Sequence, residues 1–261
     1  MPYANNNGVK IYYEVEGQGP PLVLAHGGTQ NLNLWRAMGI TQALRESFQL
    51  ILFDIRGHGL SDKPHGKSSY GTKTAGDVVA ILDNLGIAKA HFMGYSSGAL
   101  IGFMLAKAYP QRFLSFILGG MSPYGFPDGM VKLTMEAAVP FRLLKSNPDE
   151  AVRQREKLFG ITFNQQQRQA FLANDGDAVV AMLEAQFEVT PLTDKELERI
   201  AHPCLVFCGE LDPFYLGAKS GASHLSNGIF VSMAGLNHMN AFAPQVVLPH
   251  IKDFLARVSK T

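Results

Sequence analysis

The sequence contains little cysteine, and its two cysteines do not indicate a disulfide. Cys204 and Cys208 are the only ones among 261 residues, and both lie in one apolar segment. On a strand, side chains four positions apart point to the same face but lie too far apart along the chain to be bridged. We interpret them as small buried side chains rather than as a disulfide or a metal-binding pair.

An excess of charge of either sign is also absent. The chain has 23 Lys and Arg against 22 Asp and Glu, a formal net charge of +1. This balance gives no reason to expect nucleic acid or an anionic membrane as a partner. No apolar run reaches the roughly 18 residues of a membrane span. Residues 1–7 are polar and lack the pattern of a signal peptide, so we expect a cytoplasmic protein.

Short apolar segments alternate with amphipathic ones over most of the chain, in a composition that is 46% hydrophobic and 17% charged. This alternation predicts an α/β protein whose mostly parallel sheet has helices on both faces. The predicted strands are residues 9–16, 21–25, 48–53, 91–95, 113–118, 204–208 and 229–233. Helical patterns cover residues 32–44, 74–85, 99–109 and 241–258.

The alternation stops between residues 122 and 200, where no segment resembles a strand. Two helix starts are visible instead: Asn147-Pro148-Asp149-Glu150 and the capping box that begins at Thr193. This stretch is long for a loop and short for an independent domain. We therefore expect a core domain of residues 1–121 and 201–261, and a helical cap, or lid, of residues 122–200.

The segment Gly94-Tyr95-Ser96-Ser97-Gly98 lies between a predicted strand and a predicted helix. In so tight a turn the central serine is forced to a positive φ, and the flanking glycines avoid side-chain collisions between strand and helix. A chain with 26 glycines can contain such a pentapeptide by chance. Its significance therefore depends on the rest of the chain.

Other predicted strands end at residues that could complete a catalytic site. The carboxyl ends of parallel strands meet at one crevice, and the loops there contain Gly28, Ser96, Asp212 and His238. A serine hydroxyl becomes nucleophilic when a histidine oriented by a carboxylate takes its proton. We predict Ser96, His238 and Asp212 in these roles, with Glu210 as the alternative acid.

Two backbone N–H groups would stabilise the oxyanion that forms during acyl transfer, and we assign them to Gly28 and Ser97. His26 and His58 are interpreted as residues that brace their own loops. Neither has partners at metal-ligand spacing, so we predict no metal and no cofactor.

Together these segments resemble the α/β-hydrolase superfamily over nearly the whole chain. The resemblance implies an eight-stranded, mostly parallel sheet, a helical cap inserted after the sixth strand, and the same roles for the triad and the oxyanion donors. The matching segments are His26-Gly27-Gly28, Asp54-x-Arg56-Gly57-His58-Gly59-x-Ser61-Asp62, Gly94-Tyr95-Ser96-Ser97-Gly98, Asp212 and the loop containing His238.

Differences from known relatives narrow the expected chemistry. Ser96 argues against the haloalkane dehalogenases and soluble epoxide hydrolases, which have an aspartate nucleophile. No tryptophan follows His238, unlike in the carbon–carbon bond hydrolases of aromatic degradation. The elbow lacks the Gly-Gly-Ser-Trp-Gly of proline iminopeptidases. Ser97-Gly98-Ala99 replaces the Met-Gly-Gly of many relatives, which weakens the analogy to enol-lactonases and cofactor-free haloperoxidases.

The sequence thus favours a serine hydrolase that cleaves carboxylic esters of small to medium acyl groups through an acyl-enzyme on Ser96. Alternatives are a lactonase, such as an enol-lactone hydrolase, and a ligand receptor with slow or no turnover. We expect a small-molecule ester or lactone as the partner and a monomer or homodimer as the assembly. Candidate walls of the substrate pocket, for which plain core packing is the competing interpretation, are Trp35, Tyr95, Met121, Phe126, Phe141 and Met239.

Overall fold

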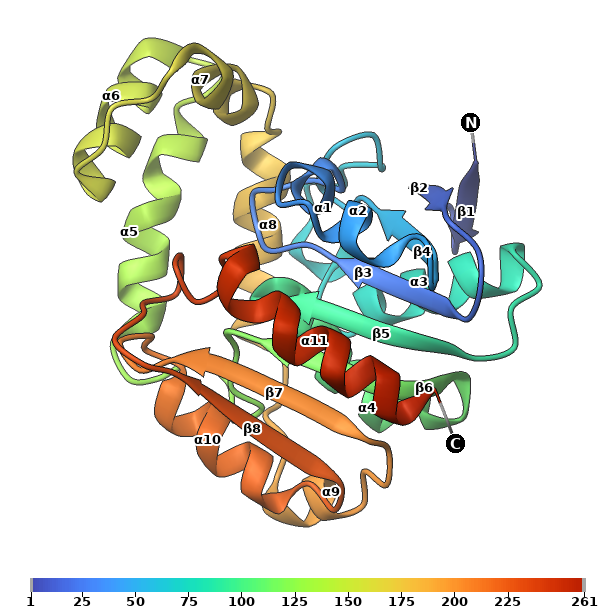
Figure 1. Cartoon of the computed structure of the whole chain (residues 1–261). Helices are drawn as coiled ribbons and strands as arrows, with labels where there is room; N and C mark the ends of the chain where they lie inside the picture. The colour runs from blue at the N-terminus through green and yellow to red at the C-terminus, as the bar shows by residue number, and fades with distance from the viewer. Residues whose placement is uncertain (1, 260–261) are drawn as a thin grey trace.

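The computed structural model describes residues 2–259, and within them eight strands form one sheet (Figure 1). The strand order is β1-β2-β4-β3-β5-β6-β7-β8. The β1–β2 and β2–β4 pairs are antiparallel and the other pairs are parallel, which confirms the predicted fold class. The strands are β1 Tyr3–Asn6, β2 Val9–Glu16, β3 Pro21–Ala25, β4 Gln49–Phe53, β5 Ala90–Tyr95, β6 Phe113–Gly119, β7 Cys204–Gly209 and β8 Gly228–Met233.

Helices cover both faces of this sheet. On one face lie α3 (Lys73–Asn84), α4 (Ser97–Ala108) and α10 (Tyr215–His224), whose buried side chains share one hydrophobic cluster. On the other face lie α1 (Asn33–Ala37), α2 (Ile40–Leu44) and α11 (Pro244–Val258), which share a second cluster. In Figure 1, α11 crosses the front of the sheet. Short 3₁₀ helices occur at η1 (Lys67–Ser69) and η2 (Pro110–Arg112).

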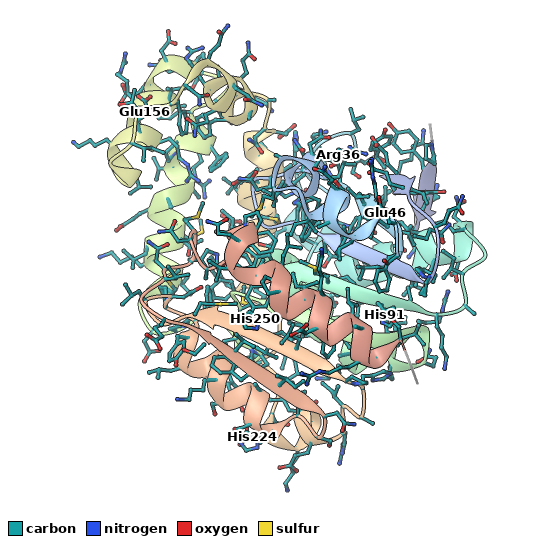
Figure 2. All side chains as sticks on the ribbon, in the orientation of Figure 1. Arg36, Glu46, His91, Glu156, His224 and His250 are labelled. Atoms are coloured by element: carbon teal, nitrogen blue, oxygen red, sulfur yellow. The ribbon has the colours of Figure 1, made fainter. Side chains whose placement is uncertain are left out.

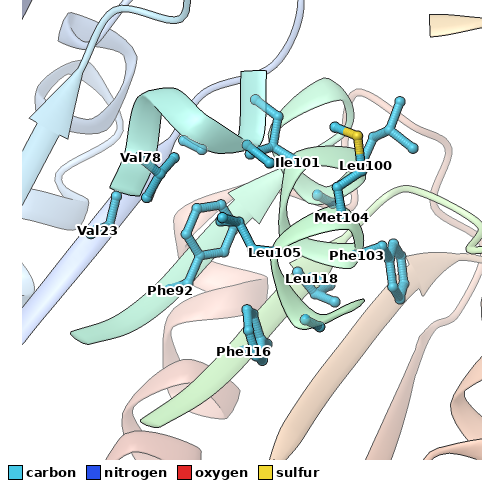
Figure 3. Close-up of a cluster of buried hydrophobic side chains, with 14 of the residues drawn as sticks. Val23, Val78, Phe92, Leu100, Ile101, Phe103, Met104, Leu105, Phe116 and Leu118 are labelled. Atoms are coloured by element: carbon cyan, nitrogen blue, oxygen red, sulfur yellow. The ribbon is translucent and has the colours of Figure 1, made fainter. Parts of the chain in front are cut away.

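The two clusters separate because successive residues of a strand point to opposite faces. On β5, Phe92 belongs to the cluster beneath α4, whereas Met93 belongs to the cluster beneath α11. Phe116 of β6 lies beside Phe92, with 6.2 Å between ring centroids, and Leu105 of α4 packs in the same cluster (Figure 3). Burial on both faces explains why these central strands are apolar without interruption.

Between β6 and β7 the described chain forms five helices: α5 (Met130–Arg142), α6 (Pro148–Phe159), α7 (Gln165–Leu172), α8 (Gly176–Gln186) and α9 (Asp194–Glu198). Both predicted helix starts are confirmed, since Asn147 accepts from the Glu150 N–H and Thr193 forms a capping box with Glu196. In Figure 1, α6 and α7 lie farthest from the sheet. None of the described helices is long and apolar enough to cross a membrane.

Three features differ from the predicted elements. The sequence of β1 is too polar to predict a strand, but it pairs with β2 along its whole length. The predicted helix over 32–44 is divided into α1 and α2 because Gly39 adopts a φ of 67°. Helix α10 was not predicted because its Gly, Ala and Ser residues give no clear apolar stripe, yet Ala218 and Ala222 are buried against the sheet.

Candidate active site

Ser96 lies in the sharp turn that joins β5 to α4. Its φ is 55°, a left-handed value that a residue with a Cβ rarely adopts. A Cβ on Gly94 would lie 2.3 Å from the Gly98 carbonyl oxygen, and one on Gly98 would lie 2.0 Å from the Ala25 carbonyl oxygen. Both glycines are therefore required by the close approach of strand and helix. The Ser96 N–H donates to the Gly119 carbonyl, 2.8 Å away, which fixes the turn to β6.

Ser96, Asp212 and His238 come from three separate strand ends and form one hydrogen-bonded row. His238 Nδ1 lies 2.7 Å from Asp212 Oδ2, and His238 Nε2 lies 3.1 Å from Ser96 Oγ. An ionised carboxylate can only accept, so Nδ1 carries the proton and Nε2 is left to accept from the serine hydroxyl. This is the geometry in which an imidazole can remove the serine proton.

The surroundings of Asp212 favour its charged form. Burial acts to raise the pKa of Asp212, but hydrogen bonds from His238 and from the Phe214 N–H lower it below the ordinary value. Glu210, the alternative acid, is exposed and accepts from Ser232 and from the Gly235 N–H. Glu210 thus stabilises the turn after β8, while Asp212 hydrogen-bonds to His238.

Gly28 and Ser97, the predicted oxyanion donors, lie next to each other. A Cβ on Gly28 would lie 3.0 Å from Ser97 Oγ and 3.6 Å from Met182 Cε. Ser97 is the first residue of α4, where backbone N–H groups have no acceptor within the helix and carry the positive end of the helix dipole. An oxyanion formed beside Ser96 would meet such a donor.

His26 and His58 brace the loop that contains Gly28. His26 Nε2 accepts from the Ile55 N–H at 3.1 Å, and His58 Nε2 accepts from the Thr29 N–H at 3.0 Å. Burial lowers the pKa of His26 to about 4, and burial together with His26 lowers the pKa of His58 to about 3. Both rings are therefore neutral near pH 7 and remain hydrogen-bond acceptors.

The three histidines labelled in Figure 2 lie outside the row formed by Ser96, His238 and Asp212. His91 lies on β5 and bonds Ser115, while His224 ends α10 and His250 lies on α11. Among the described residues, a group with metal-ligand spacing is formed by His65, Asp175 and Asp177, whose ligand atoms lie within 4.8 Å of one another. These carboxylates already have partners in the protein. Asp175 caps α8 and Asp177 pairs with Lys145.

Comparison with known proteins agrees with this architecture. Residues 20–132 match the family model described as alpha/beta hydrolase fold. The RutD protein of Azorhizobium caulinodans is 34% identical over 153 residues, which cover 59% of this chain and 56% of that protein. The enol-lactonase from Burkholderia xenovorans LB400 superposes with a TM-score of 0.78 at 26% identity, covering 98% of this chain and 100% of that one. The chain has the α/β-hydrolase fold, and these likenesses support a place in the α/β-hydrolase superfamily.

Solved structures of lower identity are alike in fold alone. A structure reported for the carboxylesterases of Nitrososphaera gargenis gives a TM-score of 0.84 at 20% identity, covering 99% of both chains. The chain matches between 36% and 56% of the length of the first three curated relatives. The fold is therefore established more firmly than any particular substrate.

Three residues that were predicted to line the substrate pocket are core residues instead. Trp35 has no exposed surface and meets Phe242 edge-on, 5.5 Å between centroids. Phe141 is 2% exposed and packs on Phe171 among α5, α6, α7 and α8. Met121 is also 2% exposed and belongs to the cluster beneath α4. Because these side chains present no surface to a ligand in this structure, their assignment to the pocket is corrected to core packing.

Tyr95 is also buried, and its contacts suggest a different role from the predicted one. Its hydroxyl donates to the backbone carbonyl of His238. Its ring stacks on Phe242 at 4.3 Å and lies 5.3 Å from the His238 ring. Burial raises the pKa of Tyr95 far above its ordinary value, so the phenol stays a donor. Tyr95 supports the histidine loop rather than lining a pocket.

Phe126 and Met239 keep accessible surface, and Met239 is 72% exposed. Phe126 meets Phe214 at 5.5 Å between centroids, and Phe214 in turn lies 6.0 Å from the His238 ring. These two remain candidates for contact with substrate. Phe214 and Met182 were not predicted, because their proximity to the site depends on how distant segments of the chain pack.

Proposed function

We propose that this protein hydrolyses carboxylic esters through an acyl-enzyme on Ser96. The observation that carries the proposal is the hydrogen-bonded row from Asp212 through His238 to Ser96. The proximity of Gly28 to Ser97 supports the pair as oxyanion donors. A buried carboxylate, an imidazole and a half-buried serine, in this order, provide an acid, a base and a nucleophile.

In the first half-reaction Ser96 Oγ attacks the ester carbonyl carbon while His238 Nε2 takes the hydroxyl proton. Asp212 stabilises the imidazolium, and the carbonyl oxygen becomes an oxyanion held by Gly28 and Ser97. When the C–O bond to the alcohol breaks, His238 returns the proton to the departing oxygen. Water then attacks the acyl-enzyme, its proton passes to His238, and the acid leaves as Ser96 regains a proton from His238.

A lactone is an internal ester, so lactonase activity is a second candidate. The likeness to the enol-lactonase from Burkholderia xenovorans, which extends over 98% of this chain, favours it. Both reactions would use the same residues, and only the pocket would differ.

We further propose that residues 122–200 act as the cap over this site. Support comes from α8, the helix of this segment that reaches the elbow: Ser97 Oγ donates to Gln186 Oε1 at 3.3 Å. Segments inserted in this way contribute to the walls of a substrate pocket.

The test is the Ser96→Ala variant, assayed with p-nitrophenyl acetate, p-nitrophenyl butyrate and a panel of lactones. We expect kcat/KM to fall by roughly a thousandfold or more, because removing the nucleophile of such a triad leaves only residual catalysis. Ser223→Ala, at an exposed position of α10, is the matched control and should retain activity. Full turnover by a folded Ser96→Ala protein would refute the mechanism. A single burst of product without steady turnover would favour the receptor alternative.

A further inference from the structure

A contact between the elbow and α8 lies directly behind the proposed oxyanion site. Ser97, whose N–H is one proposed donor, uses its hydroxyl to bond Gln186, the last residue of α8. Met182 lies one turn earlier on α8, and its Cε is 3.6 Å from the position of a Cβ on Gly28, the other donor. Two side chains of α8 thus face both donors.

The same residues close an apolar hollow. Ser97, Met182 and Gln186 line it together with Leu100, Ile101 and Met104 of α4. Only about 10 Å³ of this hollow could hold the centre of a water molecule. By that measure the hollow has room for about one water and none for an alkyl chain.

The acyl chain of a bound ester would extend toward this hollow. The acyl carbon chain is attached to the carbonyl carbon, whose oxygen would sit between Gly28 and Ser97, so the chain leaves the reaction centre close to these donors. A methionine is flexible and fills irregular apolar space. The hydroxyl of Ser97 can donate or accept, so it retains the Gln186 side chain in either amide orientation.

We propose that Met182 and Gln186, the latter held by Ser97, form a plug that limits the acyl group of the substrate to short chains. This inference rests on the proposed function and names its substrate class: esters of small acids such as acetate. With the plug withdrawn, the apolar lining from α4 would accept a longer chain.

The experiment compares kcat/KM for p-nitrophenyl hexanoate and p-nitrophenyl acetate in the wild type, Met182→Ala and Gln186→Ala. Each variant should raise the hexanoate-to-acetate ratio by roughly tenfold, the discrimination that one methylene of fit gives in an apolar pocket. Met182→Leu refills the space and should bring the ratio back toward that of the wild type. Gln166→Ala, at an exposed position of α7, should leave it unchanged.

Since Met182 is buried, circular dichroism and thermal melting must first establish that each variant is folded. An unchanged ratio in folded Met182→Ala and Gln186→Ala proteins would overturn the plug. If the wild type has no Ser96-dependent turnover, the proposed function itself fails, and thermal stabilisation by hexanamide then tests the plug separately. Stabilisation of the two variants but not of the wild type supports the plug, whereas equal stabilisation of all three overturns it.

Discussion

Replacing Tyr95 by phenylalanine should slow the reaction while leaving the protein folded. The hydroxyl of Tyr95, the last residue of β5, donates to the His238 carbonyl in the loop between β8 and α11. The variant removes that single bond. It leaves the ring free to stack on Phe242, 4.3 Å away, so the core beneath the site keeps its packing.

Two magnitudes follow from the structure. Leaving a buried carbonyl without its donor costs about 1–3 kcal/mol. The lower end applies, because this hydrogen bond is only partly buried and water can replace the lost donor. For the reaction, His238 Nε2 lies 3.1 Å from Ser96 Oγ, near the outer limit for proton transfer. A displacement of about 1 Å can cost roughly a hundredfold in rate, so we expect kcat to fall by roughly tenfold to a hundredfold.

The assay is steady-state hydrolysis of p-nitrophenyl acetate, combined with urea denaturation of the same samples. We expect a lower kcat with little change in KM, since the hydroxyl touches the base and not the substrate. Tyr215→Phe is the matched control: its hydroxyl bonds Ser232 at 3.0 Å, outside the triad. If Tyr95→Phe lost about 1 kcal/mol of stability but kept the wild-type kcat, the positioning role would be refuted.

Two further predictions concern stability. Because the pKa of His26 is about 4 and that of His58 about 3, against 6.5 ordinarily, the unfolded chain binds more protons below pH 6.5 than the folded one. The free energy of unfolding should therefore fall as the pH drops from 6.5 to about 4, by about 3 kcal/mol for His26 alone. Urea denaturation across this pH range measures the fall, and the His26→Gln variant should show a smaller dependence of stability on pH. Gly98→Ala would place a Cβ 2.0 Å from the Ala25 carbonyl oxygen, so it should lower the free energy of unfolding by about 3 kcal/mol or more, as measured by thermal melting. Gly66→Ala is the control, because the nearest atom to its Cβ would be 3.8 Å away and stability should change little. A Gly98→Ala protein as stable as the wild type would contradict the close approach at the elbow.

The parts of the fold that were predictable from sequence are those set by local rules. A central strand is apolar on both faces, so β3 was predicted with the bounds that the structure has. The helix starts at Asn147 and Thr193 were predictable because a helix cap needs particular side chains at particular spacings. The turn at Ser96 was predictable from the Gly-x-Ser-x-Gly spacing, and at Gly94 the reason is local, since a Cβ there would meet Gly98 four residues later. At Gly98 the reason is not local, since a Cβ there would meet Ala25 of β3.

The pocket was not predictable in this way. An aromatic side chain in the sequence gives no sign of whether it faces a substrate or the opposite layer of the core. Trp35 and Phe141 were both assigned to the pocket, but each is enclosed by a cluster assembled from separate helices. Phe126 is an aromatic residue like them, but it keeps accessible surface. What separates these residues is the packing of layers, which no local pattern encodes.

At Ser97, one feature was predictable from the local sequence and another depends on the packing of distant segments. Its backbone N–H follows from the elbow itself, since the residue after the nucleophile begins α4 whatever its side chain is. Its side chain was visible only as a departure from the residue common among relatives. The reason for a hydroxyl there involves Gln186, 89 residues later in the chain. If the plug is correct, the backbone of Ser97 serves the chemistry and its hydroxyl serves the choice of acyl group, so exchanging the side chain could alter specificity while the oxyanion donor remains in place.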